Sequence, residues 1–171
     1  MNETVYIQLG SNIGDRESYL QAAIERIESL EGLELIAVSG IYVSEAQDME
    51  EDSPSFLNQV IKTEYAYTAN ELLRSLETIE CDLGRTGKGE NLPRTIDLDI
   101  LLFGDRIIDS ESLRVPHPEL LNRPFVMIPL LEIDPNIKHP ASKRPIAGFL
   151  ADRDREHVIL YKDYVARNIR A

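Results

Sequence analysis

The sequence predicts an α+β fold in which helices pack on an antiparallel sheet in the ferredoxin-like order βαββαβ. Three observations support this prediction. Apolar and polar residues alternate in four separate segments, as they do in half-buried strands. Two segments between these strands repeat apolar residues with the 3.6-residue period of a helix. A proline-rich extension then follows the last strand of this order.

The first predicted unit is a strand followed by a helix. The strand ends at Gly10, segment 10–14 forms a tight turn, and Asp15 is a suitable N-cap for the helix. Gly32 ends that helix. The alternating strand positions are Val5, Ile7 and Leu9, and the periodic helix positions are Leu20, Ala23, Ile24, Ile27 and Leu30.

Two strands and a second helix come next. We expect the strands at residues 33–43 and 56–67, separated by the acidic polar segment 44–55. Thr68 is the predicted N-cap of the helix, and the glycine-containing loop 84–93 follows it. The inner face of this helix carries Leu72, Leu73, Leu76, Ile79 and Leu83.

The last strand of this order contains two aspartates, Asp97 and Asp99. Both side chains should point to the same side, with Cβ atoms roughly 6.6 Å apart, so the site favours a cation between them. Carboxylate pairs of this kind suit Mg²⁺, including two ions ~3.5–4 Å apart. The alternative is that the two aspartates lie on a solvent-exposed strand face and bind no cation. One face carries Ile96, Leu98, Ile100 and Leu102, and the other carries Thr95, Asp97, Asp99 and Leu101.

The rest of the chain is an extension of the same domain, which we expect to span residues 1–171. Residues 115–118 read as an extended pivot, 119–122 as a short helical turn and 125–133 as an apolar helix. The tail from Arg153 onward is compatible with a strand or a helix.

Charge and composition restrict the function. The 171 residues carry a formal charge of −12, which argues against binding to nucleic acid or to an anionic membrane. Residues 1–84 hold 4 Lys/Arg against 17 Asp/Glu, whereas residues 85–171 hold 14 against 13, so the cations concentrate in the second half. The N-terminus lacks a signal-peptide pattern, and the lone Cys81 fits a reducing compartment. We therefore expect a cytoplasmic protein.

Several residues near the acidic pair could bind phosphate. Arg85 and Arg94 bracket the loop 84–93, and guanidinium groups suit phosphate oxygens, although each could equally be a surface charge. Glu80 lies at the edge of the apolar helix face, so its carboxylate either has a partner in Arg85 or the metal region, or extends to solvent. His117 is held between two prolines, which suits a phosphate contact or a packing role equally well.

An aromatic and an amide side chain could bind a flat heterocycle. Phe56 and Asn58 alternate with Leu57 and should project to one side of their strand. Phe125 is a candidate for the opposite wall of such a pocket.

These motifs together resemble the 6-hydroxymethyl-7,8-dihydropterin pyrophosphokinases of folate biosynthesis. The resemblance covers nearly the whole chain up to about Phe149, in family order and spacing. It rests on "YIQLGSNIGDRESYL", "FLNQV", "IECDLGR", "PRTIDLDILLFGD" and "VPHPELLNRPFVMIPLLEI".

The resemblance implies transfer of the β,γ-pyrophosphate of ATP to the pterin hydroxymethyl group, with release of AMP. It implies that Asp97 and Asp99 hold two Mg²⁺ ions and that Arg85 and Arg94 neutralise the moving phosphates. Lys88 and Arg114 take the places of basic residues that many members carry nearby. The remaining implied contacts are Glu80, His117 and Arg123 to the nucleotide, and Ser44, Phe56, Asn58 and Phe125 to the pterin.

Two other functions remain compatible with these residues. A different magnesium-dependent phosphotransferase could use the same aspartate pair, and it would not use a pterin. A non-catalytic ligand-sensing module is the other class, although it has no need of the acidic pair and the two arginines together. The partners we expect are ATP and hydroxymethyldihydropterin, bound by a monomer.

Overall fold

The computed structural model describes residues 2–44, 55–84 and 95–162. The strands are β1 (Glu3–Ser11), β2 (Leu33–Val38), β3 (Ile41–Ser44), β4 (Phe56–Tyr65), β5 (Asp97–Phe103), β6 (Ile108–Asp109), β7 (Arg114–Val115) and β8 (Ile159–Lys162). The helices are α1 (Arg16–Glu28), α2 (Ala69–Asp82), α3 (Pro124–Ile133) and α4 (Asp152–Arg155), with 3-10 turns η1 (Leu120–Asn122) and η2 (Ile146–Phe149).

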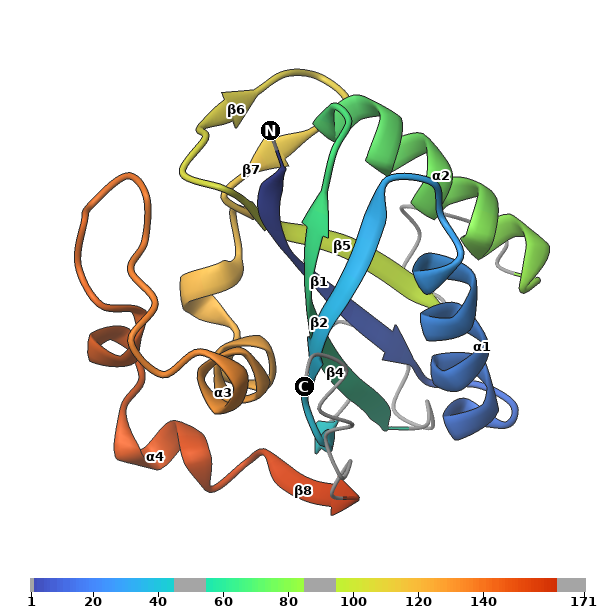
Figure 1. Ribbon diagram of the computed structural model, residues 1–171. Coiled ribbons are helices and arrows are strands. Elements are labelled where there is room, and N and C mark those ends of the chain that lie inside the picture. The colour runs from blue at the N-terminus through green and yellow to red at the C-terminus, as the bar shows by residue number, and fades with distance from the viewer. Residues whose placement is uncertain (1, 45–54, 85–94, 163–171) are drawn as a thin grey trace.

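Six strands form one antiparallel sheet with helices on both faces. The strand order is β5-β1-β4-β3-β8, and β2 also pairs with β4. Helices α1 and α2 lie on one side of the sheet and α3 on the other (Figure 1). Strands β6 and β7 form a separate small hairpin that the sequence pattern does not predict. The predicted antiparallel sheet with packed helices is thus confirmed.

Both long helices begin where their capping residues predict. The side chain of Asp15 accepts a hydrogen bond from the N–H of Ser18, at 3.2 Å, at the start of α1. Thr68 and Glu71 form a reciprocal capping box at the start of α2. Gly32 follows α1 with a φ of 76°, a conformation in which a side chain would be strained. Strand β1 extends through Ser11, one residue beyond its predicted end.

The sheet separates two apolar cores. Alternate residues of β1 and β4 pack under α1 and α2, whereas the intervening residues pack against α3. On β4, for example, Ile61 belongs to the first core and Val60 to the second, and both side chains are fully buried. Strand β4 therefore joins the two halves of the molecule.

The predicted single strand 33–43 is wrong, because the chain leaves the ladder at Ser39 and Gly40. The N–H of Ser39 donates to the carbonyl of Val60, and the Ser39 hydroxyl accepts from the Val60 N–H, each at 2.9 Å. The N–H of Gly40 donates to the carboxylate of Glu132 on α3. Strands β2 and β3 are therefore two separate elements.

The predicted alternation also fails at the end of β5. Tyr6 pairs with Leu102 and Ile7 with Ile100, so Leu101 is an extra residue in a bulge. Leu102 consequently lies with Leu101 in the α3 core and not on the face of Ile100. The bulge moves Leu102 to the opposite face from the predicted one.

The extension after the hairpin returns to the sheet. The predicted turn and apolar helix are present as η1 and α3. The tail contains both of the anticipated possibilities, a short helix α4 and the strand β8, which pairs with β3. Among the described residues, no helix is both long enough and apolar enough to cross a membrane.

Candidate functional site

Strand β5 presents Asp97 and Asp99 on the sheet face that also carries α3. Both residues are partly exposed, whereas Leu98 between them is 2% exposed and packs in the core under α1 and α2. Asp97 pairs with Gly10 of β1, and Asp99 pairs with Gln8. The two carboxylates therefore project from one face of the sheet, as their spacing predicts.

Gly10 also pairs with Asn58 on its other side, which connects the acidic pair to the aromatic segment. A Cβ atom placed on Gly10 would lie 3.5 Å from the Phe56 ring and 3.9 Å from Asn58 Oδ1. The ring and the amide oxygen thus lie over the backbone of this glycine. Phe56 and Asn58 project to the same side. Because β4 and β5 flank β1, the spacing between strands places the Cα atoms of Asn58 and Asp97 about 10 Å apart.

The Asn58 amide is held in one orientation by β3. Its Nδ2 donates to Ser44 Oγ at 2.7 Å and to the Tyr42 carbonyl at 3.2 Å. Asn58 and Ser44 are 1% and 5% exposed. Because the protein uses the donors of the amide, the Asn58 side chain can accept a further hydrogen bond only through its oxygen.

His117 and Arg123 lie near the acidic pair. The His117 backbone N–H donates to the Leu101 carbonyl at 2.9 Å, and its Nδ1 accepts from the N–H of Glu119 at 3.1 Å. Burial lowers the pKa of His117, and the Arg123 cation lowers it further, against opposing effects of Asp97 and Glu119. Because Nδ1 accepts a hydrogen bond, neutral His117 carries its proton on Nε2, which can therefore donate.

Phe125 follows on the first turn of α3. The Arg123 guanidinium lies 5.9 Å from the centroid of its ring, within the range of a cation–π contact. The Phe125 ring also packs on the edge of the α3 core. The start of α3 thus supplies both a cation and an aromatic ring.

Glu80 does not extend to solvent. It is 2% exposed, and its Oε2 accepts a hydrogen bond from the N–H of Leu98 at 2.9 Å. The solvent-exposed alternative for this residue is therefore wrong. The carboxylate meets β5 between its two aspartates.

Of the other predicted basic residues, the structure describes Arg114. Arg114 is exposed on β7, where its Nε lies 3.3 Å from Asp109 Oδ1. The predicted contacts of Arg85, Lys88 and Arg94 fall outside the described residues.

Asp97 and Asp99 supply the donor set that Mg²⁺ prefers. Within the described part of the chain, no cluster of three or more His, Cys, Asp and Glu side chains could hold a metal ion. Mg²⁺ commonly takes only one or two protein carboxylates and completes its octahedron with water and substrate phosphates. The pair therefore fits Mg²⁺ that arrives with a polyphosphate.

Sequence reasoning missed Gln8, which lies between the two halves of this face. Gln8 is 6% exposed and pairs with Asp99 on one side and Val60 on the other. The available signal was a polar residue on the alternate positions of an otherwise apolar strand. The sequence could not place Gln8 beside Asp99, because that neighbour depends on which strands flank β1.

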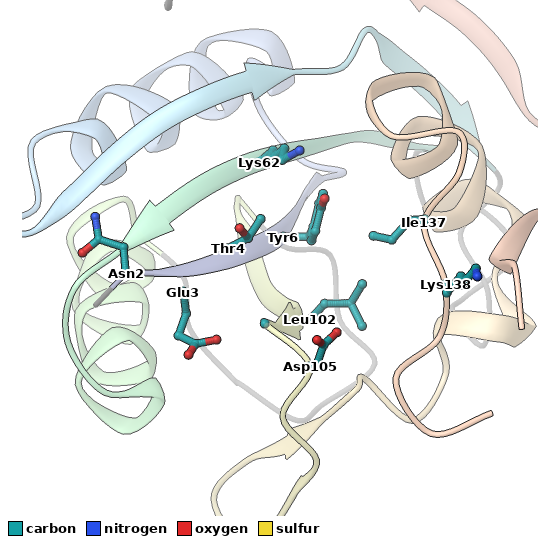
Figure 2. A pocket seen from close by; sticks show the side chains of 10 residues that line it. Asn2, Glu3, Thr4, Tyr6, Lys62, Leu102, Asp105, Ile137 and Lys138 are labelled. Carbon is teal, nitrogen blue, oxygen red and sulfur yellow. The ribbon is translucent and has the colours of Figure 1, made fainter. Parts of the chain in front are cut away.

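A separate cavity of about 550 Å³ lies on the same sheet face toward the other end of β1 (Figure 2). Its lining includes Tyr6, Lys62 and Lys138 and none of the predicted site residues. The Tyr6 hydroxyl donates to Asp134, and burial followed by this contact raises the Tyr6 pKa. Lys62 Nζ is 3.6 Å from the same carboxylate. These groups anchor the segment that follows α3.

The chain is similar to known proteins over most of its length. Residues 6–135 match the model of the family described as 7,8-dihydro-6-hydroxymethylpterin-pyrophosphokinase (HPPK). A 2-amino-4-hydroxy-6-hydroxymethyldihydropteridine pyrophosphokinase of Aquifex aeolicus is 44% identical over 146 residues, covering 85% of this chain and 89% of the relative. The Bacillus subtilis protein of the same name is 40% identical over 162 residues, covering 95% and 92%.

Solved structures show the same fold. The wild-type HPPK-DHPS of Plasmodium falciparum with pteroate aligns with a TM-score of 0.67 at 14% identity, covering 87% of this chain and 42% of that chain. An HPPK-DHPS in complex with substrates aligns with a TM-score of 0.64 at 14% identity, covering 87% and 43%. The present chain thus spans less than half of these two-part proteins.

Proposed function

The chain belongs to the 7,8-dihydro-6-hydroxymethylpterin-pyrophosphokinase family, and from this premise we propose how its residues carry out the reaction. The enzyme transfers pyrophosphate from ATP to 6-hydroxymethyl-7,8-dihydropterin in folate biosynthesis. A single observation carries the assignment of residues: Gly10 pairs with Asp97 on one side and Asn58 on the other. An acidic pair and an aromatic–amide pair therefore share one sheet face, without a side chain between them at that register.

On the pterin side, Phe56 and Phe125 enclose the ring and Asn58 binds its edge. The fixed amide oxygen of Asn58 accepts a hydrogen bond from an N–H of the pterin, while Ser44 acts through its contact with the Asn58 amide. Any side chain at position 10 would occupy part of the space beside Phe56 and Asn58, so glycine leaves that space available for the pterin.

On the nucleotide side, Asp97 and Asp99 would hold two Mg²⁺ ions that arrive with the triphosphate. Bound Mg²⁺ would neutralise phosphate charge and stabilise the leaving oxygen. Arg85 and Arg94 follow the transferred group, and His117 donates through Nε2 while Arg123 contributes a fixed cation. Lys88 and Arg114 complete the proposed nucleotide contacts, whereas buried Glu80, expected from the sequence to contact the nucleotide, acts through its hydrogen bond to Leu98 of β5.

The chemical step is an in-line displacement at the β-phosphorus. The pterin hydroxymethyl oxygen forms a bond to the β-phosphorus as the bond from that phosphorus to the α,β-bridging oxygen breaks. The hydroxyl proton passes to solvent, and AMP leaves with the electron pair of the broken bond. The protein contributes positioning and charge stabilisation rather than a covalent intermediate.

Phosphorus NMR of a reaction with ATP, magnesium and hydroxymethyldihydropterin tests the proposal. AMP and a pterin diphosphate are expected as the only new products. Formation of ADP would indicate transfer of the γ-phosphoryl group and would overturn the proposed attack at the β-phosphorus. Omission of the pterin is the control, because AMP should then not accumulate.

Four features of the whole molecule complete the proposal. We count β2 and β3 as one interrupted strand, which makes the arrangement ferredoxin-like. Residues 1–171 act as a single domain, and the enzyme works as a monomer in the cytoplasm. Sedimentation velocity of the full chain would test the oligomeric state directly.

A further inference from the structure

The Glu80 side chain occupies an unusual position for a carboxylate. It is 2% exposed, and its Oε2 accepts a buried hydrogen bond of 2.9 Å from the N–H of Leu98. Burial of a carboxylate is costly unless its oxygens accept hydrogen bonds. The hydrogen bond from Leu98 therefore offsets part of the cost of burying the Glu80 carboxylate between α2 and β5.

The position of β5 in the sheet explains why Leu98 needs this acceptor. In the described sheet β5 is a terminal strand, paired on one side with β1. Backbone groups of successive residues in an antiparallel strand point alternately toward and away from the partner, so the Leu98 N–H faces the open side. Leu98 is itself 2% exposed, so water has little access to that N–H. Glu80 replaces the missing neighbouring strand at this one residue.

Glu80 is also rigidly placed. The adjacent Ile79 is 1% exposed and lies in the same core as Leu98. Helix α2, which carries both residues, is capped at its start by Thr68 and Glu71. The hydrogen bond thus connects β5 to a side chain whose helix is itself held in place by core packing.

Building on the proposed function, we propose that Glu80 is a positioning residue that fixes the direction of Asp97 and Asp99 through the peptide N–H of Leu98 between them. Rotation of the backbone at Leu98 would turn the two carboxylates relative to one another. Mg²⁺ demands near-ideal octahedral geometry, so it tolerates such a rotation poorly. Hydrogen bonds that orient metal ligands typically change metal affinity or activity by about 10–100-fold.

Three substitutions separate positioning from a direct charge effect. Glu80→Ala removes the acceptor, Glu80→Gln keeps an oxygen acceptor without charge, and Glu80→Asp keeps the charge but shortens its reach. The Mg²⁺ concentration for half-maximal activity should rise about tenfold or more in the Ala and Asp variants. It should stay within about threefold in the Gln variant, because a neutral acceptor still bonds the N–H. Glu77→Ala, at an exposed position on the same helix, is the matched control and should leave it unchanged.

A second measurement does not depend on activity. Hydrogen exchange and the NMR signal of the Leu98 amide should report a protected N–H in the wild-type and Gln proteins without metal. The Ala and Asp variants should lose that protection, while core amides remain protected. Titration with Mg²⁺ and a non-hydrolysable ATP analogue should then saturate at higher concentration for these two variants.

The outcomes are decisive in either direction. Loss of Leu98 protection with an unchanged Mg²⁺ requirement would overturn the positioning role. A Gln variant as impaired as the Ala variant would also overturn it, because the charge itself would then act on metal or nucleotide. If the wild-type enzyme produces ADP, the proposed function fails, whereas the Leu98 exchange result is independent of the product formed.

Discussion

At the scale of single residues, the candidate site depends on small differences between neighbours on one strand. Leu98 is buried while Asp97 and Asp99 beside it are partly exposed, because alternate side chains point to opposite faces. Gly10 contributes by having no side chain, and Asn58 by having its donors occupied. Each property belongs to one residue, but its effect on the site depends on the residues that pair with it on the neighbouring strands.

We predict that Asp97→Asn or Asp99→Asn lowers kcat by about 100-fold or more, since each removes a charge from the site without changing shape. Thermal unfolding of each variant should remain close to that of the wild type, because the apolar face of β5 is unaltered. Steady-state rates at saturating magnesium provide the measurement. A near-wild-type rate in either variant would contradict the assignment of these carboxylates.

We predict that Phe56→Ala and Asn58→Ala weaken pterin binding about tenfold or more, corresponding to roughly 1.4 kcal/mol, while ATP binding changes little. Both side chains lie over Gly10, away from the proposed nucleotide side. Calorimetric titration with each ligand separately checks this. Equal losses for both ligands would argue against two distinct subsites.

His117 should make stability depend on pH in a defined direction. Burial, with help from Arg123, lowers its pKa below the ordinary value of 6.5, so the unfolded chain binds the proton more readily. Its stabilising contribution is therefore present above about pH 6.5 and is lost as the pH falls through the lowered pKa. Urea unfolding between about pH 5 and 7 should show a shallower pH dependence for His117→Gln than for the wild type. Identical slopes would rule out this contribution.

At the scale of elements, α3 connects the proposed nucleotide and pterin sides of the site. Its start carries Phe125 next to Arg123, and its last turn carries Glu132. Glu132 accepts from the Gly40 N–H, at 3.0 and 3.2 Å for its two oxygens, and from the Tyr42 hydroxyl at 2.5 Å. These bonds hold the start of β3, the strand whose Ser44 orients the Asn58 amide.

We predict that Glu132→Ala destabilises the protein by about 1–3 kcal/mol, because it leaves the Gly40 N–H without its acceptor. Through β3, it should also raise the KM for the pterin more than the KM for ATP. Glu132→Gln retains an acceptor and should recover most of both effects. Urea unfolding and steady-state kinetics on the two variants test the link, which fails if the KM for the pterin is unchanged in Glu132→Ala.

At the scale of the whole molecule, β4 belongs to both cores. Its Val60 side chain packs against α3, and the next side chain, Ile61, packs under α1 and α2. An unfolding event in one core should therefore disturb the other through the shared strand.

We predict that Val60→Ala and Ile61→Ala both shift one common unfolding transition and do not create two. Removal of buried methyl groups should cost about 1–4 kcal/mol in each case, which lowers Tm by several degrees in a domain of this size. Differential scanning calorimetry should give equal calorimetric and van't Hoff enthalpies. Two resolved transitions in either variant would contradict a single cooperative domain.

The local pattern of the sequence determined the helices with their caps, the paired aspartates and the shared face of Phe56 and Asn58. These features follow from neighbouring residues, because helix periodicity, capping and strand alternation are short-range effects. The family resemblance, in contrast, rests on the order and spacing of whole sequence motifs.

Only the tertiary structure decided how those segments meet. The bulge at Leu101, the break at Ser39 and Gly40, and the burial of Glu80 depend on pairing with residues far along the chain. A strand's register and the partner of a buried carboxylate are set by long-range contacts, which local periodicity does not encode. That is why the sequence could name Asp97 and Asn58 separately, while the register of β1 placed them on either side of Gly10.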